Sequence, residues 1–183
     1  MPLSPIPPDE AARLVLLHGY AILDTPLEST FDQLVARAAG LFGAPGAALS
    51  LVDGDRVWYK ARHGDGPRER PRSAAFCSHA ILGDDVLVVE DLAGDPRFAD
   101  NPTVTGAPHV RFYAGAPLIA PQRRRLGALC VTDVVVRAAT AEQKRGLARL
   151  AQEAMTRLEI RHALESATSL LLTPPAPALA SPR

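Results

Sequence analysis

The sequence has few cysteines, few aromatic residues and no excess of charge of either sign. Its 183 residues include two cysteines and one tryptophan, and 20 Lys and Arg residues balance 20 Asp and Glu residues. Nucleic acids and anionic membranes attract proteins with a surplus of Lys and Arg, so the balanced charge argues against either as the main partner. Cys77 and Cys130 stand outside any zinc-binding spacing, and we therefore predict no metal site.

Long apolar runs and export signals are also missing. No uninterrupted apolar segment approaches the roughly 20 residues that are needed to span a bilayer. The start of the chain, Met1–Pro8, is rich in proline and lacks the cationic stretch and apolar run of a signal peptide. We therefore expect a protein of the cytoplasm, where its thiols stay reduced, with no membrane as partner.

What the sequence does contain suits one globular domain. Hydrophobic residues make up 47% and charged residues 22%, and the length fits a single core. Proline residues cluster at both ends of the chain. We predict a flexible segment over residues 1–8, a folded domain over residues 9–168 and a disordered, proline-rich tail over residues 169–183.

Three helices are predicted from apolar spacing and capping residues. Asp9 and Gly19 bound the first helix. Ser29 begins a capping box for the second, whose apolar stripe ends before Gly43, and Thr140 begins another for a long last helix.

A hairpin and further strands lie between these helices. AALSLVD and RVWYKAR flank an Asp-Gly turn, and alternation puts Val57, Tyr59 and Ala61 on one face. More strands are predicted at residues 86–89, 111–119 and 126–131. Strands that join mostly by turns form antiparallel sheets, so the fold class is α+β. The aromatic pairs 58–59 and 112–113 should each split, with one ring on either side of the sheet.

No motif of a known catalytic class is present. Nothing resembles GxSxG, HExxH, a P-loop or a dinucleotide fingerprint, and we predict that the chain is not an enzyme. Cys77 and His79 share a face if AFCSHAIL is a strand and diverge if it is a helix, and the sequence leaves both open. We expect a buried thiol there, since a reactive thiolate needs a cation or a helix N-terminus beside it. Cys130 is expected in the core. The basic run Arg123–Arg125 is expected on a solvated loop, with an anion or an acidic partner as the alternative.

Several segments together resemble the GAF domains of bacterial signalling proteins, above all those N-terminal to histidine kinases and diguanylate cyclases. They are ILDTP with FDQLVARAAGLF, SLVDGDRVWYKAR, AFCSHAIL, DPRFADNPTVTGAPHVRFYAGAPL and LGALCVTD. The resemblance covers about residues 8–164. It implies a GAF-like antiparallel sheet with helices packed on one face and a small ligand cavity.

The resemblance also implies a function and a set of candidate residues. It suggests a stand-alone cytoplasmic sensory module that binds a small molecule of unknown identity and signals to a partner protein in trans, as in bacterial two-component systems. A homodimer through the last helix fits the same family. The candidate pocket residues are Trp58, Cys77, His79, Asp91, Arg97, Arg111, Tyr113 and Asp133.

Two alternatives accompany this hypothesis. One is a dimerising scaffold without a small ligand. The other is a thiol-dependent reductase of free methionine sulfoxide, which we disfavour because only Cys77 suits such chemistry in the sequence. The resemblance fixes no cofactor. A linear tetrapyrrole is not expected, since the segment CSH does not match the placing of the bilin-binding cysteine.

Overall fold

The computed structural model describes residues 5–172. Residues 1–4 of the predicted flexible segment and residues 173–183 of the predicted tail lie outside the described residues. The elements are α1 (Glu10–Gly19), α2 (Ser29–Phe42), β1 (Gly46–Val52), β2 (Arg56–His63), β3 (Glu69–Pro71), the 3₁₀ turn η1 (Arg72–Ala74), α3 (Cys77–Ala80), β4 (Leu87–Val89), α4 (Pro102–Thr105), β5 (Phe112–Ile119), β6 (Arg125–Asp133) and α5 (Ala141–Leu172).

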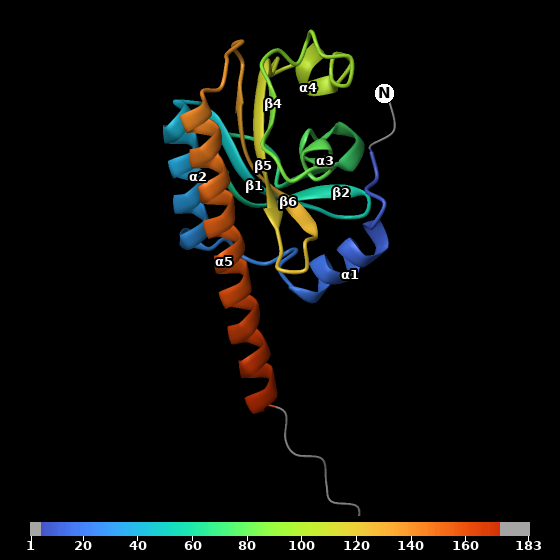
Figure 1. Cartoon of the computed structure of the whole chain (residues 1–183), viewed down its shortest axis with the longest axis vertical. Helices are drawn as coiled ribbons and strands as arrows, with labels where there is room; N and C mark the ends of the chain where they lie inside the picture. The colour runs from blue at the N-terminus through green and yellow to red at the C-terminus, as the bar shows by residue number, and fades with distance from the viewer. Residues whose placement is uncertain (1–4, 173–183) are drawn as a thin grey trace, which may run out of the picture.

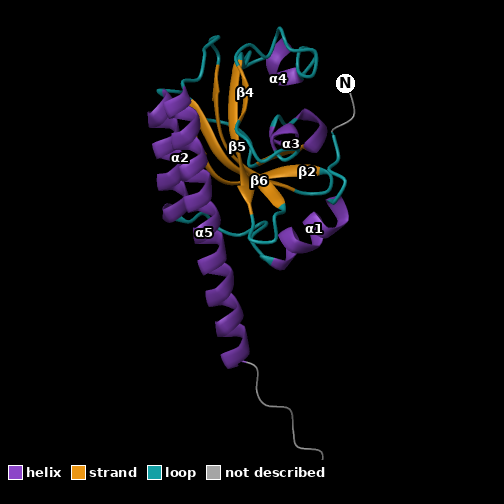
Figure 2. Cartoon of the chain, in the orientation of Figure 1, coloured by secondary structure: helices purple, strands orange, loops and turns teal. Residues whose placement is uncertain are grey.

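The six strands form one antiparallel sheet, which confirms the predicted α+β class. The spatial order is β3-β2-β1-β6-β5-β4, and neighbouring strands run antiparallel. The four longest strands, β2, β1, β6 and β5, occupy the middle of the sheet, which is drawn in orange in Figure 2. The predicted strands therefore exist, each within a residue or two of its expected bounds.

The two longest helices cover one face of this sheet. In Figure 1, α2 and α5 lie side by side against it, and their apolar stripes join a core cluster with the inner faces of β1, β5 and β6. Gly43 has φ of 57° and ends α2 in the left-handed conformation that glycine tolerates. Thr140 and Gln143 form the predicted capping box: the Thr140 hydroxyl accepts from the Gln143 N–H at 3.1 Å, and the Gln143 side-chain oxygen accepts from the Thr140 N–H at 3.0 Å.

The predicted start of the second helix was wrong. The residue before α2 is Glu28, and Ser29 is already helical, so no capping box forms there. Helix α5 continues to Leu172, beyond the end of the predicted domain at residue 168. The reason is local: Leu170, Leu171 and Leu172 favour helix, and the first proline comes only after them.

The sheet alternates as predicted except at one bulge. Trp58 and Phe112 join the cluster under the long helices, whereas Tyr59 and Tyr113 join a second cluster on the opposite face. Ala61 lies on the Trp58 side, so the prediction that it shares a face with Tyr59 was wrong. The pairing of β1 with β2 shifts register between Leu49 and Ser50, which leaves Lys60 as the extra residue and reverses the alternation beyond it.

The opposite face of the sheet is covered by short segments. Helix α3 lies against it (Figure 1), and α3, α4 and their connections close a second apolar cluster. The chain forms a turn at Asp95, whose carboxylate accepts a bond from the Arg97 N–H at 2.9 Å. Asn101 caps α4, and Pro102 is the first residue of that helix.

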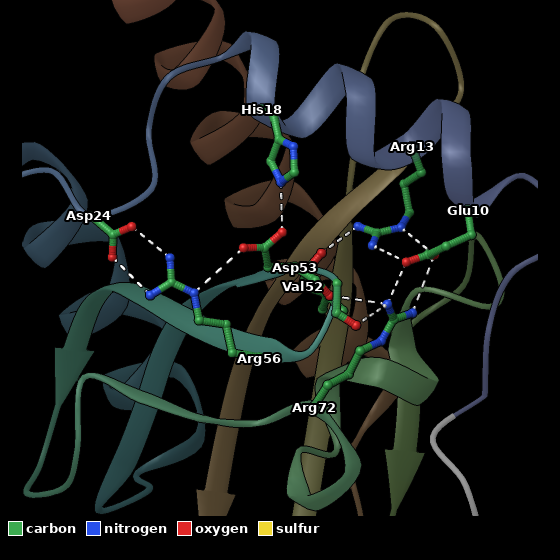
Figure 3. Close-up of polar contacts among 9 residues, drawn as sticks. Glu10, Arg13, His18, Asp24, Val52, Asp53, Arg56 and Arg72 are labelled. Carbon is green, nitrogen blue, oxygen red and sulfur yellow. Dashed lines mark hydrogen bonds and ion pairs between the residues drawn. The ribbon is translucent and has the colours of Figure 1, made fainter.

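A network of charged side chains docks α1 onto the β1–β2 hairpin (Figure 3). The Arg13 guanidinium is 1% exposed, and it donates to the Val52 carbonyl at 2.6 Å and to the Glu10 carboxylate at 2.7 and 2.9 Å. Arg72 of η1 also donates to Glu10, and to the Asp53 carbonyl at 3.1 Å. Because η1 leads directly into α3, this network fixes where the cover of the second face begins.

Candidate functional site

A cavity of about 290 Å³ lies on the sheet face opposite α2 and α5. Its floor is formed by side chains of β1, β2, β5 and β6, and its walls by η1, α3 and the segment that follows α4. The residues at its rim include Arg62, His63, Asp65 and Arg70. Apolar walls with a few polar groups are the usual make-up of a small-molecule site.

Two thiols meet at the cavity. Cys77 begins α3, Cys130 lies in the middle of β6, and their sulphur atoms are 3.7 Å apart. Both cysteines are free and buried, with 3% and 4% of their surface exposed, and both line the cavity. A bonded disulfide has sulphurs about 2 Å apart, so the pair is a contacting dithiol.

The environment differentiates the two thiols. The hydrogen bond from Cys130, assisted by the Ser50 and Tyr113 hydroxyls, lowers the pKa of Cys77 to about 7 against the opposing effect of burial. The same bond and burial raise the pKa of Cys130 well above its ordinary value. These opposite directions make Cys77 the more acidic thiol of the pair.

Two polar atoms on the cavity side are buried without a hydrogen-bond partner among the described residues. They are the Arg62 Nε and the Tyr113 hydroxyl oxygen. The Arg62 guanidinium lies 4.8 Å from the centre of the Tyr59 ring, and its Nη2 donates to the Asp65 carbonyl at 2.9 Å. A buried polar group without a partner costs about 1–3 kcal/mol, so such atoms at a cavity indicate a place for a bound molecule.

Three of the eight residues predicted for the pocket line this cavity: Cys77, Tyr113 and Asp133. Asp133 is buried at the end of β6, where its carboxylate pairs with Arg137 at 2.5 Å and accepts a bond from the Val134 N–H at 2.7 Å. Its charge is thus already neutralised inside the chain.

The other five predicted residues do not line this cavity. Trp58 faces the long helices, because it alternates with Tyr59 along β2. His79 diverges from Cys77 on helix α3 and packs edge-on against Phe98 at 4.6 Å between ring centres. Burial, with the positive charge of Arg97 nearby, lowers the pKa of His79 and favours its neutral form.

Asp91, Arg97 and Arg111 form ion pairs close to the turns that carry them. Arg111 pairs with Asp91 at 2.8 Å, and Arg97 pairs with Asp95 at 2.6 Å. These partners satisfy the charges locally, as expected for capped connectors.

The basic run on the β5–β6 loop is also paired within the chain. Arg123 and Arg125 contact Asp84 at 2.6 and 2.7 Å, and Arg124 contacts Asp9 at 2.9 Å. Arg123 is nevertheless 74% exposed, in line with the solvated loop that the sequence predicts, and its charge is paired within the chain.

The lining residues that sequence reasoning missed include Tyr59, Arg62 and Cys130. Alternation could have found two of them, since Tyr59 and Cys130 follow Trp58 and Leu129, which face the helices. Cys130 was predicted as core, and it is indeed buried, but at the cavity and beside Cys77. Its partner lies 53 positions away, a distance over which the sequence carries no signal.

Among residues 5–172, no group of three or more His, Cys, Asp or Glu side chains is arranged to hold a metal ion. The helices of that range include none with the length and apolarity to cross a membrane.

Comparison with known proteins yields one family and consistent structural neighbours. The GAF domain model matches residues 26–158, which leaves α1 outside the match. A cyclic di-GMP phosphodiesterase from Pseudomonas aeruginosa is 41% identical over 143 residues, covering 78% of this chain and 24% of that protein. The chain therefore spans about a quarter of the length of this curated relative.

Two solved structures illustrate the shared fold. Free methionine-R-sulfoxide reductase from Neisseria meningitidis has a TM-score of 0.62 at 19% identity, with 88% of this chain and 99% of that one covered. The GAF domain of a phosphoenolpyruvate-protein phosphotransferase from Coxiella burnetii also has a TM-score of 0.62, at 16% identity, with coverage of 85% and 96%. At these identities the likeness concerns the fold alone.

Proposed function

The chain belongs to the GAF domain family, and on that premise we propose that it is a non-enzymatic sensory module that binds a small molecule in the cavity under α3 and passes the cavity's state to a signalling partner. One observation carries the proposal: a cavity of about 290 Å³ bordered by Arg62 and Tyr113, each of which has a buried polar atom without a partner within the described chain. The proposal places the module in the cytoplasm, with reduced thiols.

The cavity lining defines the chemistry of the ligand. Phe76, Val110 and the ring of Tyr59 offer apolar contact, whereas Arg62 Nε offers a donor and the Tyr113 hydroxyl either a donor or an acceptor. A compact, mostly apolar organic molecule with a carboxylate or carbonyl group satisfies all of these groups. Binding would then recover part of the cost of the two unpartnered atoms.

The central strands connect the cavity with the last helix. Cys130 faces the cavity, whereas its neighbours Leu129 and Val131 pack in the cluster that also holds Leu147 and Leu158 of α5. A ligand that alters the position of β6 therefore alters the surface on which α5 rests. Such coupling requires that the ligand bind two arrangements with different affinity.

The partner is inferred from the curated relative. That relative is named as a cyclic di-GMP phosphodiesterase. We assign to this module a partner of the same class, an enzyme that makes or degrades a nucleotide second messenger, reached in trans and through α5. A homodimer in which α5 meets its twin is part of the same proposal, with Ile160 and Leu164, 56% and 64% exposed, as its contact residues.

Native mass spectrometry of the protein purified from its own host tests the ligand. The expected result is a bound species that is lost on denaturation and that binds again to the unfolded-and-refolded protein. Tyr113→Phe and Arg62→Leu should each reduce binding about tenfold, the effect of about 1.4 kcal/mol from one lost hydrogen bond. Arg149→Leu, at an exposed position of α5, is the matched control. A cavity that stays empty in host extract, with dimer formation unchanged, supports the ligand-free scaffold.

A second candidate is favoured by one specific contact. Reduction of free methionine sulfoxide requires paired thiols, and Cys77 and Cys130 lie 3.7 Å apart at the cavity. Reduced protein incubated with free methionine-R-sulfoxide would produce methionine and lose two thiols per molecule. Turnover with a thiol reductant, abolished in Cys77→Ser, would replace the sensory proposal with an enzymatic one.

A further inference from the structure

The thiol pair has one fixed and one adjustable member. Cys130 lies on β6, a strand paired on both sides, opposite Ala48 of β1 and Gly115 of β5. Cys77 lies on α3, a helix of four residues held between turns. To form a disulfide, sulphurs 3.7 Å apart must approach to about 2 Å, which side-chain rotation and a small shift of α3 can supply.

The surroundings of the pair suit a sulphur anion. Ser50 is fully buried, and its hydroxyl donates to the Ala128 carbonyl at 2.8 Å. The Tyr113 hydroxyl has no hydrogen-bond partner within the described residues. The contact with Cys130 and the nearby Tyr113 hydroxyl lower the pKa of Cys77, which favours its thiolate. The same contact and burial raise the pKa of Cys130.

Access to the pair is limited to small molecules. Both sulphurs are buried and reached through the cavity of about 290 Å³. A bulky disulfide or another protein's thiol cannot bring its sulphur to Cys77 without opening the cover. Hydrogen peroxide and short alkyl hydroperoxides fit the space and are two-electron oxidants of thiolates.

We propose that Cys77 and Cys130 are a redox-active dithiol that small hydroperoxides oxidise through the cavity, with Cys77 as the attacking and Cys130 as the resolving sulphur. This goes beyond ligand sensing and does not depend on it. The oxidised state would link α3, part of the cover, covalently to β6, part of the floor.

The chemistry balances in two steps. The Cys77 thiolate attacks the terminal oxygen of the hydroperoxide, the O–O bond breaks, and the alkoxide that leaves takes up a proton as the alcohol (water, for hydrogen peroxide). The Tyr113 hydroxyl is available to donate a hydrogen bond to that leaving oxygen. Cys130 sulphur then attacks the sulfenic acid on Cys77, its proton departs with the hydroxyl as water, and the S–S bond forms. The dithiol loses two electrons and the hydroperoxide gains them.

Peroxide titration of the reduced full-length protein tests the proposal. The expected product of one equivalent of hydrogen peroxide is a monomer that has lost two hydrogen atoms, with a disulfide between the peptides that contain residues 77 and 130. The rate should exceed that of free cysteine at the same pH. A bulky hydroperoxide such as cumene hydroperoxide should react about tenfold more slowly, because the cavity restricts access.

Variants separate the two sulphurs. Cys130→Ser should stop at the sulfenic acid, with one oxygen atom gained and trapped by dimedone, whereas Cys77→Ser should leave Cys130 at least tenfold less reactive than Cys77 in the intact chain. Circular dichroism melting checks that both variants fold, and Cys77→Ala replaces Cys77→Ser if the serine variant does not.

Several outcomes overturn the proposal. Thiols that react no faster than free cysteine, a disulfide that links two chains, and equal products from the two serine variants each do so. Oxidation by free methionine-R-sulfoxide without reaction toward hydroperoxides also overturns it and supports the reductase candidate. A pair that stays reduced in the presence of peroxide, with a ligand from the host in the cavity, overturns it and leaves the proposed sensory function in place.

Discussion

The two faces of the sheet differ in the segments that cover them and in the side chains that line them. The face under α2 and α5 is closed by two long helices and lined by apolar side chains such as Leu129 and Phe112. The other face is closed by short helices and turns, and it carries a cavity, two thiols and buried hydroxyls. Because neighbouring residues of a strand point to opposite faces, the same strands supply stability on one side and a reactive site on the other.

The largest expected contrast lies in two adjacent residues of β6. Leu129 is fully buried under the long helices and Cys130 borders the cavity. Leu129→Ala should lower the free energy of unfolding by about 3 kcal/mol, because it leaves a void in a closely packed core. Cys130→Ala should cost about 1 kcal/mol, since it enlarges a space that already exists. Urea denaturation of both variants measures the difference. Equal losses would mean that the two faces are packed alike.

The second contrast concerns how each cover is held. Apolar burial holds α2 and α5, whereas the cover of the cavity begins at Arg72, which is held by the charged network around Glu10. Burial raises the pKa of Glu10, but the hydrogen bonds from Arg13 and Arg72 outweigh it and lower the pKa from 4.5 to about 2. A carboxyl with a lowered folded pKa stabilises the protein above its unfolded pKa and loses that contribution as the pH falls.

Because the pKa of Glu10 is lowered in the folded state, acidification tests the role of this carboxylate. Between about pH 4.5 and 2, amide hydrogen exchange should rise in η1 and α3 before it rises in α2 and α5. Glu10→Gln should cost about 2 kcal/mol at pH 7, because two buried guanidinium groups lose their anion, and should flatten the acid response. Glu90→Gln, at an exposed position, is the control. Simultaneous exchange in all four segments would show that charge does not hold the cover separately.

The sequence predicts features that depend on residues close together in the chain, and it misses contacts between segments that are far apart in the chain. The helix stripe ending at Gly43, the capping box at Thr140 and the splitting of Trp58 from Tyr59 depend on residues a few positions apart, and all are confirmed. The bulge at Lys60 is different. It places a fully buried ammonium within 2.6 to 2.9 Å of Glu28, Pro26 and Thr25, three partners from a distant loop.

The candidate site follows the same rule. All eight predicted pocket residues resemble family positions in sequence, yet strand alternation, ion pairs or helix direction turn five of them away from this cavity. The contact between Cys77 and Cys130 depends on how a four-residue helix settles on a central strand. The position of this helix depends on η1 and its charged network. The sequence around Cys77 and the sequence around Cys130 give no indication of that position.

Substitutions at two glycines, one on each side of the sheet, test the same comparison with an effect of intermediate size. A methyl group at Gly115 would lie 2.7 Å from the Cζ atom of the Tyr113 ring, whereas one at Gly40 of α2 would meet no atom within 4 Å. Gly115→Ala should cost about 1–2 kcal/mol and push the Tyr113 ring into the cavity, which would slow peroxide oxidation of Cys77. Gly40→Ala should stabilise the protein by about 0.5–1 kcal/mol, since alanine favours helix. Thermal melting with thiol kinetics measures both, and an unchanged oxidation rate in Gly115→Ala would argue against a role for Tyr113 in the site.

The smallest expected effect separates two tyrosine hydroxyls. Tyr20, at the end of α1, donates to Glu159 of α5, whereas Tyr113 has no partner among the described residues. Tyr20→Phe should therefore lower the free energy of unfolding by about 1 kcal/mol, the net value of one hydrogen bond, whereas Tyr113→Phe should raise it by about 1 kcal/mol, because it removes a buried hydroxyl that has no partner. Chemical denaturation at neutral pH resolves this difference.

Measurements of ligand binding and of the Cys77 pKa should be sensitive to Tyr113 and not to Tyr20. Tyr113→Phe should weaken ligand binding and raise the pKa of Cys77, because the hydroxyl near its thiolate is lost. Tyr20→Phe should change neither. If Tyr113→Phe destabilised the free protein as much as Tyr20→Phe does, its hydroxyl would already be satisfied inside the fold, and the cavity would offer a ligand one anchor fewer. In the expected case, the Tyr113 hydroxyl adds nothing to the stability of the fold, yet it lowers the pKa of the buried Cys77 thiol. A residue kept for binding or reactivity, and not for packing, is expected to behave in this way.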